Sequence, residues 1–256
     1  MTANCAVVPA PAGRPDRARS LAAILGLPLI MRLDQVHAPV ALVVDDTAAW
    51  LQQTGPGAAG PVRVDFADPG MQHRRKGGHN ELLGRAVGVR AARKPVVFDA
   101  TAGLGRDAYV LADLGCEVTL CERSPVLSLL LQEAIASAEI SVQPDVRAAA
   151  ARMTLIGADA RDRETSPGEV IYLDPMFPDR RSSAAVRKDL ATLQQLHDAE
   201  PDDGEALLAW AQRQPAPRIV VKRPPKAPPL AGMKVSHAIS GKAVRFDVWV
   251  RPEFER

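Results

Sequence analysis

Residues 96–108 constrain the fold of this chain more than any other stretch. They begin with an apolar run at 96–100, continue through a turn that contains Gly103 and Gly105, and end in residues suited to the start of a helix. Glycine has no Cβ, so it adopts positive φ and lets a ligand approach bare backbone. The N–H groups and the dipole of the following helix point at such a ligand. The stretch therefore predicts a strand, a glycine turn and a helix that bind a small molecule together.

Predicted strands and helices alternate from residue 95 to the end of the chain. This alternation is typical of an α/β fold in which helices cover both faces of a parallel sheet. We expect strands at 96–100, 117–121, 153–156, 170–173, 219–221 and 246–250, and helices at 107–114, 126–137, 183–196 and 204–212.

The 256 residues suit one large domain with a small additional lobe. Residues 1–66 are expected to form a small α/β lobe, 67–94 a basic loop and a connecting helix, and 95–256 the ligand-binding domain. Within the lobe we expect strands at 5–8, 40–44 and 62–66, a helix at 16–25 and a short helical turn at 47–53.

Composition narrows the class of protein. The net charge is only +2, so any affinity for nucleic acid must come from a local patch. The 3 cysteines form no C-x-x-C pair, which is typical of reduced thiols in the cytoplasm rather than of disulfides or a zinc site. No apolar run approaches the roughly 18 residues of a membrane span, and the histidines show no metal-ligand spacing. We expect a cytoplasmic protein with no metal and no membrane partner.

Acidic side chains follow several of the predicted strands. Asp99 ends the first strand, Asp107 lies in the helical turn after the glycines, and Glu122 and Asp159 follow the next two strands. Ligands of an open parallel sheet bind beyond the carboxyl ends of its strands. There Glu122 is suited to accept hydrogen bonds from both hydroxyls of a ribose, and Asp159 to accept one from an adenine amine. The carboxylates of Asp99 and Asp107 would repel the pyrophosphate of a dinucleotide but tolerate the cationic centre of S-adenosylmethionine (SAM).

Residues 103–108 also fit G-x-G-x-x-A, the fingerprint of dinucleotide-binding folds. An NAD(P)-dependent oxidoreductase therefore remains an alternative to a SAM-dependent enzyme.

The motif Asp-Pro-Met-Phe-Pro at residues 174–178 follows the predicted strand 170–173. Its prolines fix a rigid turn that presents the Asp174 carboxylate and the Pro175 carbonyl as acceptors beside the ring of Phe177. The exocyclic amine of a base is a poor nucleophile because its lone pair is delocalised. Acceptors that hold the amine localise that lone pair and orient it toward a sulfonium methyl group, while an aromatic ring stacks the base. The motif predicts methylation of such an amine.

Basic residues gather near the predicted ligand-binding edge. A basic run is followed by two glycines that allow the backbone to approach phosphates. A solvated charged loop is the alternative interpretation. The predicted RNA path consists of His73, Arg74, Arg75, Lys76, Arg180, Arg181, Lys222 and Arg223.

The order of these motifs resembles the class I SAM-dependent methyltransferases, and 174–177 is similar to their amino-methylating loop. More narrowly, the stretches 64–66, 73–76, 99–108, 122–123, 174–178 and 221–224 resemble the ribosomal RNA small subunit methyltransferase J family, over roughly residues 62–250. The resemblance implies a Rossmann-like, mostly parallel sheet with helices on both faces and SAM as the methyl donor. It also implies transfer to the N2 amine of a guanine in 16S rRNA, as free RNA or in the small ribosomal subunit.

Carried over position by position, the resemblance implies cofactor contacts at Arg106, Asp107, Glu122, Arg123, Asp159, Ala160 and Asp174, which join Asp99, Gly103 and Gly105. We expect Asp174, Pro175 and Phe177 to be the catalytic residues. Two positions depart from the family pattern, because Thr101 replaces the usual first glycine and Met176 replaces the second proline. The same motifs also suit an amino-methyltransferase of DNA or protein, or an RNA-binding protein that has lost its activity.

Overall fold

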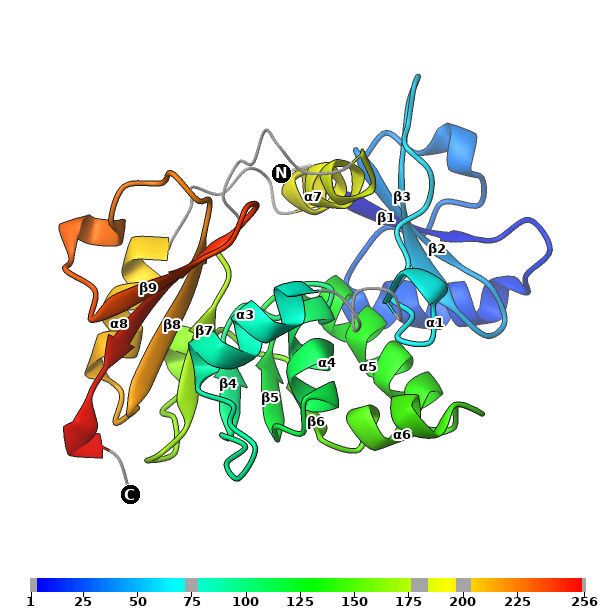
Figure 1. Cartoon of the computed structure of the whole chain (residues 1–256). Helices are drawn as coiled ribbons and strands as arrows, with labels where there is room; N and C mark the ends of the chain where they lie inside the picture. Colours follow the sequence, from blue (N-terminus) through cyan, green and yellow to red (C-terminus); the bar gives the residue numbers. More distant parts are fainter. Residues whose placement is uncertain (1–3, 72–77, 176–183, 197–203, 255–256) are drawn as a thin grey trace. The chain divides into compact units, whose positions relative to one another are not determined.

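The computed structural model describes residues 4–71, 78–175, 184–196 and 204–254 (Figure 1). Packing divides the chain into two compact units, of which the first is residues 1–64 with 180–201 and the second is 65–179 with 202–256. The segment 180–201, which we expected in the ligand-binding domain, groups with the first unit. Its helix α7 (Ala184–Leu196) contacts that unit through Thr192, whose hydroxyl accepts from Gln53 Nε2 at 3.1 Å, and through Lys188, which donates to the carbonyl of Pro61 at 3.0 Å.

The first unit is built on a three-stranded sheet in the order β1-β2-β3. Strand β1 pairs in parallel with β2, and β2 pairs antiparallel with β3. Both β1 and β2 are buried along their whole length, because their sequences are almost wholly apolar. The elements are β1 (Cys5–Pro9), α1 (Pro15–Leu25), β2 (Val40–Val44), β3 (Ala49–Gln53) and α7.

Two predictions for the first part of the chain are wrong. The predicted helical turn at 47–53 is absent, because residues 49–53 form strand β3. The Asp45 carboxylate accepts from the backbone N–H groups of Thr47 and Ala48 and so folds a tight hairpin turn before the strand. Residues 62–66 form no strand, since only Val62 bridges to Leu51. Phe66 is instead buried, with 1% of its surface exposed.

The second unit contains a seven-stranded sheet in the order β6-β5-β4-β7-β8-β10-β9, in which β10 runs opposite to the other six strands. Counted from β4, the first five strands follow the 3-2-1-4-5 order of doubly wound folds. The predicted fold class is confirmed. The strands are β4 (Val97–Asp99), β5 (Val118–Cys121), β6 (Met153–Ile156), β7 (Val170–Leu173), β8 (Arg218–Arg223), β9 (His237–Ser240) and β10 (Arg245–Val250).

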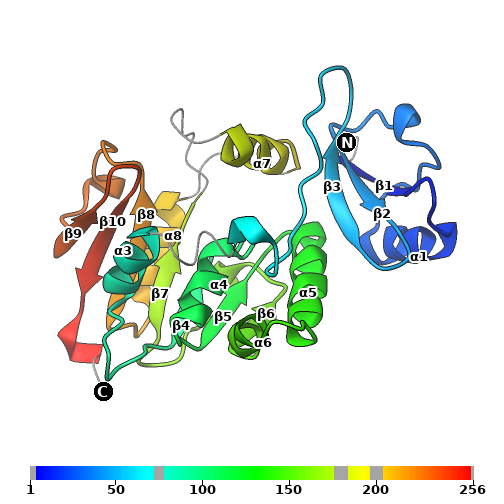
Figure 2. The same cartoon turned by 45° about the vertical axis from the view of Figure 1, so that its right-hand side comes forward.

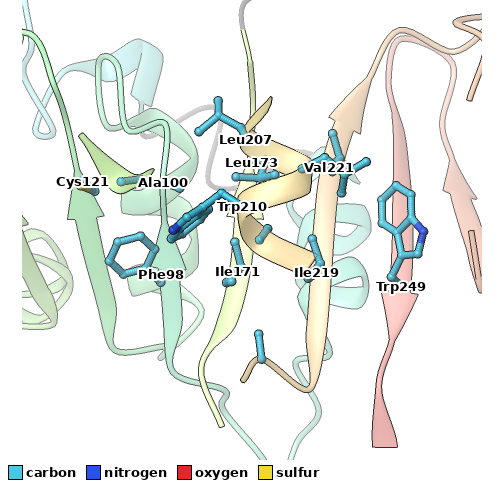
Figure 3. Close-up of a cluster of buried hydrophobic side chains, with 14 of the residues drawn as sticks. Phe98, Ala100, Cys121, Ile171, Leu173, Leu207, Trp210, Ile219, Val221 and Trp249 are labelled. Atoms are coloured by element: carbon cyan, nitrogen blue, oxygen red, sulfur yellow. The ribbon is translucent and has the colours of Figure 1, made fainter. Parts of the chain in front are cut away.

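Helices cover both faces of this sheet (Figure 2). Successive strand residues point to opposite faces. Ile171 packs in a cluster with Trp210 of α8 (Figure 3). The hydroxyl of Tyr172 instead reaches Asp107 of α4, so α4 and α8 lie on opposite faces. The helices are α3 (Gly78–Val87), α4 (Arg106–Asp113), α5 (Pro125–Glu139), α6 (Pro144–Ala150) and α8 (Gly204–Arg213), of which α6 was not predicted. None of the helices in the described ranges is long and apolar enough to span a membrane.

The strand order of the second unit fixes where a ligand binds. Strand β4 lies between β5 and β7, so the chain changes direction across the sheet at β4. Ligands of doubly wound sheets bind beyond the carboxyl ends of the strands at such a point. The glycine turn follows β4 and Asp174 follows β7, which places both predicted motifs at this position.

Candidate active site

The glycine turn adopts the backbone conformation that its sequence predicts. Gly103 and Gly105 have φ values of 55° and 68°, a region that residues with a Cβ avoid. A Cβ on Gly105 would lie 2.6 Å from Leu131 Cδ2 and 3.1 Å from Phe66 Cζ, so this glycine lets α4 pack closely. A Cβ on Gly103 would meet only the Thr101 carbonyl, at 3.9 Å, among the described atoms outside its chain neighbours. The backbone at Gly103 is thus open to a ligand.

A pair of stacked aromatic rings packs against the glycine turn. The ring of Phe66 stacks on Tyr109 of α4, with centroids 4.9 Å apart and an interplanar angle of 3°. Both rings are almost fully buried. Sequence reasoning missed this role for Phe66, although residues 64–66 belong to the family resemblance.

Glu122, at the end of β5, is tied to the same turn. Its Oε2 accepts from the N–H of Gly103 at 2.8 Å, and its Oε1 accepts from the N–H of Ser124 at 2.8 Å. Burial raises the pKa of Glu122, while these two backbone donors oppose the shift. Each carboxylate oxygen keeps a second lone pair, so the predicted hydrogen bonds to ribose hydroxyls are compatible with this geometry.

We expected Asp99, at the end of β4, to add negative charge to the site, and this expectation is not met. Its side chain is buried, and it accepts from the N–H of Thr101 at 3.1 Å. Burial, assisted by the nearby carboxylates of Asp107 and Asp174, raises the pKa of Asp99 to about 8. At neutral pH this carboxyl group is therefore largely protonated.

A lysine joins two of the predicted site carboxylates. Lys222, near the end of β8, donates to Asp107 Oδ2 at 2.6 Å and to Asp174 Oδ2 at 2.7 Å. The hydroxyl of Tyr172 donates to the same oxygen of Asp107 at 2.7 Å. Burial by itself would lower the pKa of Lys222, but the two carboxylates raise it above its ordinary value, so the ammonium stays charged.

Thr101 connects the glycine turn to the exit of β7. Its hydroxyl oxygen accepts from the N–H of Asp174 at 2.6 Å, a hydrogen bond that glycine at this position could not make. In addition, the N–H of Ala100 donates to the carbonyl of Tyr172 at 3.0 Å. The departure from the family pattern at Thr101 thus anchors the start of the predicted catalytic loop beside the turn.

The remaining predicted cofactor residues also follow strand ends. Asp159 begins a short 3₁₀ turn after β6, and Arg161 forms a salt bridge with it that lowers the pKa of its carboxyl group. Ala160 beside it is buried. Arg106 starts α4, and Arg123 follows Glu122 on the exposed side of the β5 exit. The contacts of these four residues with a cofactor stay predictions.

Several predicted residues lie outside the part of the chain that the structure describes. They are Phe177 of the catalytic loop and His73, Arg74, Arg75, Lys76, Arg180 and Arg181 of the predicted RNA path. Pro175 is described and is buried. The last two residues of the predicted RNA path use their charged groups in contacts within the protein. Lys222 pairs with two carboxylates. Arg223 is 5% exposed and donates to the carbonyl of Pro228 at 2.8 Å.

Comparisons with known proteins agree with this architecture. A family model described as "Putative SAM-dependent methyltransferase" matches residues 27–251. The chain is similar to the ribosomal RNA small subunit methyltransferase J of Pseudomonas fluorescens strain SBW25, with 44% identity over 241 residues that cover 91% of this chain and 89% of the relative. The protein of the same name from Thioalkalivibrio sulfidiphilus is 45% identical over 246 residues, 92% and 93% of the two chains. The crystal structure of a SAM-dependent methyltransferase from Neisseria gonorrhoeae superposes with a TM-score of 0.72, at 30% identity and with 95% of each chain covered.

Proposed function

Because this chain belongs to the ribosomal RNA small subunit methyltransferase J family of SAM-dependent methyltransferases, we propose that it methylates the exocyclic N2 amine of a guanine in 16S rRNA. Family membership decides against the NAD(P)-dependent oxidoreductase that the glycine fingerprint left open. The substrate is the RNA of the small ribosomal subunit, free or assembled, and the enzyme acts where that RNA lies, in the cytoplasm.

The residues of the glycine turn fit SAM. Gly103 leaves the backbone uncovered, and Glu122 beside it offers carboxylate oxygens to ribose hydroxyls. Ionised Asp107 and Asp174 lie at the same edge and favour a positively charged sulfonium. When bound, SAM supplies an electrophilic methyl group. The cofactor contacts that we propose are Asp99, Gly103, Gly105, Arg106, Asp107, Glu122, Arg123, Asp159, Ala160 and Asp174.

Asp174 carries the chemistry that we propose for the protein. Its backbone N–H donates to the hydroxyl oxygen of Thr101 at 2.6 Å, and this hydrogen bond keeps Asp174 beside the glycine turn. Its carboxylate, with the carbonyl of Pro175, is suited to accept hydrogen bonds from a base amine and so to localise the nitrogen lone pair. Phe177 is proposed to stack the extruded base.

Lys222 acts on Asp174 as a positioning residue. Its ammonium fixes one carboxylate oxygen of Asp174 at 2.7 Å and so sets the orientation of the carboxylate that is proposed to accept from the amine. The attack forms a nitrogen–carbon bond as the sulfur–methyl bond breaks, and the electron pair of the broken bond stays on sulfur. The positive charge passes from sulfur to the methylated nitrogen, which is strongly acidic in that form, so its proton leaves after transfer, to Asp174 or to water.

Incorporation of a tritiated methyl group from SAM tests the substrate. We expect label in small-subunit rRNA or small ribosomal subunits, and none in DNA or in a protein extract. Nucleoside mass spectrometry of the labelled RNA should identify N2-methylguanine. Label in DNA or protein would instead support an amino-methyltransferase of those substrates, and another methylated nucleoside would contradict guanine N2 as the acceptor.

Loss of the gene provides the matched test in cells. Ribosomal RNA from cells that lack the protein should lose one N2-methylguanine, and expression of the wild-type chain should restore it. A variant that carries Asp174→Ala should not restore it.

A further inference from the structure

The segment that follows β8 is a turn rich in proline, and two arginines hold it. The N–H of Ala227 donates to the carbonyl of Pro224 at 3.1 Å and closes the turn. Arg223 Nη2 donates to the carbonyl of Pro228, and Arg245 Nη1 donates to the carbonyls of Pro225 at 3.1 Å and Ala227 at 2.9 Å. We call residues 224–229 the clasped turn.

The arginine that makes two of these bonds is itself held in place. Arg245 Nε and Nη2 pair with the two carboxylate oxygens of Asp247 at 2.7 and 2.9 Å, and Asp247 is 2% exposed. Burying charged groups is costly unless each is paired. The paired Arg245 and Asp247 do more than join two strands. They fix the shape of the clasped turn before any partner binds, and this removes from binding the entropic cost of ordering the turn.

A second turn lies at the same edge of the sheet. Residues 241–244 join β9 to β10, and the N–H of Gly241 donates to the carbonyl of Val244 at 2.7 Å. A Cβ on Gly241 would lie 2.6 Å from Leu82 Cδ1, so this hairpin turn is seated closely on α3. Because Arg245 pairs with Arg223 in the antiparallel register of β10 and β8, the hairpin turn and the clasped turn lie side by side.

Each turn presents one exposed lysine. Lys226 lies in the middle of the clasped turn, and Lys242 lies in the hairpin turn. This is the reacting edge of the sheet, because the parallel register that pairs Leu173 with Val221 brings Asp174 next to Lys222. Lysine ammonium groups bind phosphates as compact point charges.

We propose that the clasped turn and the hairpin turn form a contact surface for the RNA backbone, with Lys226 and Lys242 binding phosphates beside the target guanine. This inference rests on the proposed function. A base that leaves its stack for methylation must have its flanking backbone held, and two rigid turns at the same end of the sheet as Asp174 provide that hold. Arg223 and Arg245 stabilise the conformation of the clasped turn, and the exposed lysines supply the positive charge of the surface.

Binding of a labelled single-stranded fragment of small-subunit rRNA, measured by fluorescence anisotropy at several salt concentrations, tests this surface. In the double variant Lys226→Ala/Lys242→Ala we expect affinity to fall about tenfold at low salt. The slope of log affinity against log salt should become shallower by about 1.4, as expected for two lost phosphate contacts. In methylation assays the KM for RNA should rise while kcat stays unchanged. The matched control is Arg93→Ala/Lys94→Ala, which removes two positive charges just before β4, at the opposite edge of the sheet, and should leave the slope unchanged.

Arg245→Lys tests the clasp, because a lysine cannot pair with Asp247 and hold two carbonyls at once. This variant should lose RNA affinity as Lys226→Ala does while its affinity for SAM stays unchanged. If the wild type binds and methylates the RNA but the double lysine variant keeps the wild-type slope and KM, the contact surface is refuted and the proposed function stands. If the wild type neither binds the RNA nor methylates rRNA or small ribosomal subunits, both fall.

Discussion

Strands β2 and β4 look alike in sequence but end in very different environments. Each is a short apolar run that leads into an aspartate, Asp45 after β2 and Asp99 at the end of β4. Asp45 accepts from two backbone N–H groups of an accessible turn, which lowers its pKa, whereas burial raises the pKa of Asp99 to about 8. The first aspartate shapes a hairpin at little cost, and the second is a costly buried acid.

The same contrast extends to the sheets that contain these strands. The described residues of β1 and β2 bury almost only apolar side chains. The carboxyl edge of the seven-stranded sheet buries Asp99, Asp107 and Glu122 and surrounds Lys222 with carboxylates. Buried charges reduce stability unless each has a partner, so their concentration at one edge marks the region where function rather than stability sets the residues.

The largest effect should come from the exposed end of the charged network. Asp174→Ala should reduce methyl transfer by at least about 10³-fold, because the acceptor of the amine is lost, while affinity for SAM changes by less than about tenfold. Single-turnover kinetics and calorimetry with S-adenosylhomocysteine measure the two quantities.

Leu42→Ala in the apolar sheet provides the control for this variant. It should lower the free energy of unfolding by about 3 kcal/mol and leave the rate per folded molecule unchanged. Turnover retained by Asp174→Ala would show that another group holds the amine.

Lys222→Met should lower the free energy of unfolding by about 3 kcal/mol, because Asp107 and Asp174 would remain close together without their shared cation. Lys188→Met, on α7 of the first unit, removes a lysine that donates to the carbonyl of Pro61 and lies 3.9 Å from Asp189 Oδ1, and should cost about 1 kcal/mol. Denaturant unfolding of both variants gives the comparison. Equal losses of unfolding free energy in the two variants would contradict a special role for Lys222 in separating the charges of Asp107 and Asp174.

Gly105→Ala should destabilise the protein by about 2 kcal/mol, since it combines a positive φ with a collision against Leu131 and Phe66. Gly26→Ala has a similar φ of 63° but no atom within 4 Å of the added Cβ, and should cost about 1 kcal/mol. Thermal unfolding of the two variants separates the steric contribution from the backbone contribution. A smaller loss for Gly105→Ala than for Gly26→Ala would contradict close packing under the turn.

The pH dependence of stability should have opposite signs at the two aspartates. The folded pKa of Asp99 lies above its unfolded value of 3.8, so the folded state binds the extra proton and stability decreases as pH rises from about 4 to about 8. The slope is at most about 1.4 kcal/mol per pH unit, and Asp99→Asn should remove it. For Asp45, whose folded pKa is lowered, stability is lost as pH falls below about 4, and Asp45→Asn should abolish that loss. Urea unfolding at a series of pH values measures both.

The sequence predicts local structure well wherever short-range chemistry decides it. Strands β6 and β7 match the predicted bounds, and the glycine turn after β4 adopts the positive φ values that only glycine favours. The predicted strand at 62–66 and helical turn at 47–53 are wrong, because Phe66 is drawn into packing against α4 and Asp45 reverses the chain. At Phe66 a contact distant in the sequence outweighs the local pattern, whereas at residues 45–48 the error lies in missing a short-range turn that Asp45 stabilises.

By itself the sequence determined the fold class, and it singled out the edge of the sheet proposed for SAM and the loop proposed as the acceptor, because alternating apolar runs, glycines and prolines act over a few residues. Only the tertiary structure decided how the charges are used. Residues that are distant in the sequence, Asp107, Asp174 and Lys222, meet because β4, β7 and β8 are neighbours in the sheet. Residue types reveal a charge, but its pKa and its partner depend on burial and on what lies across the sheet.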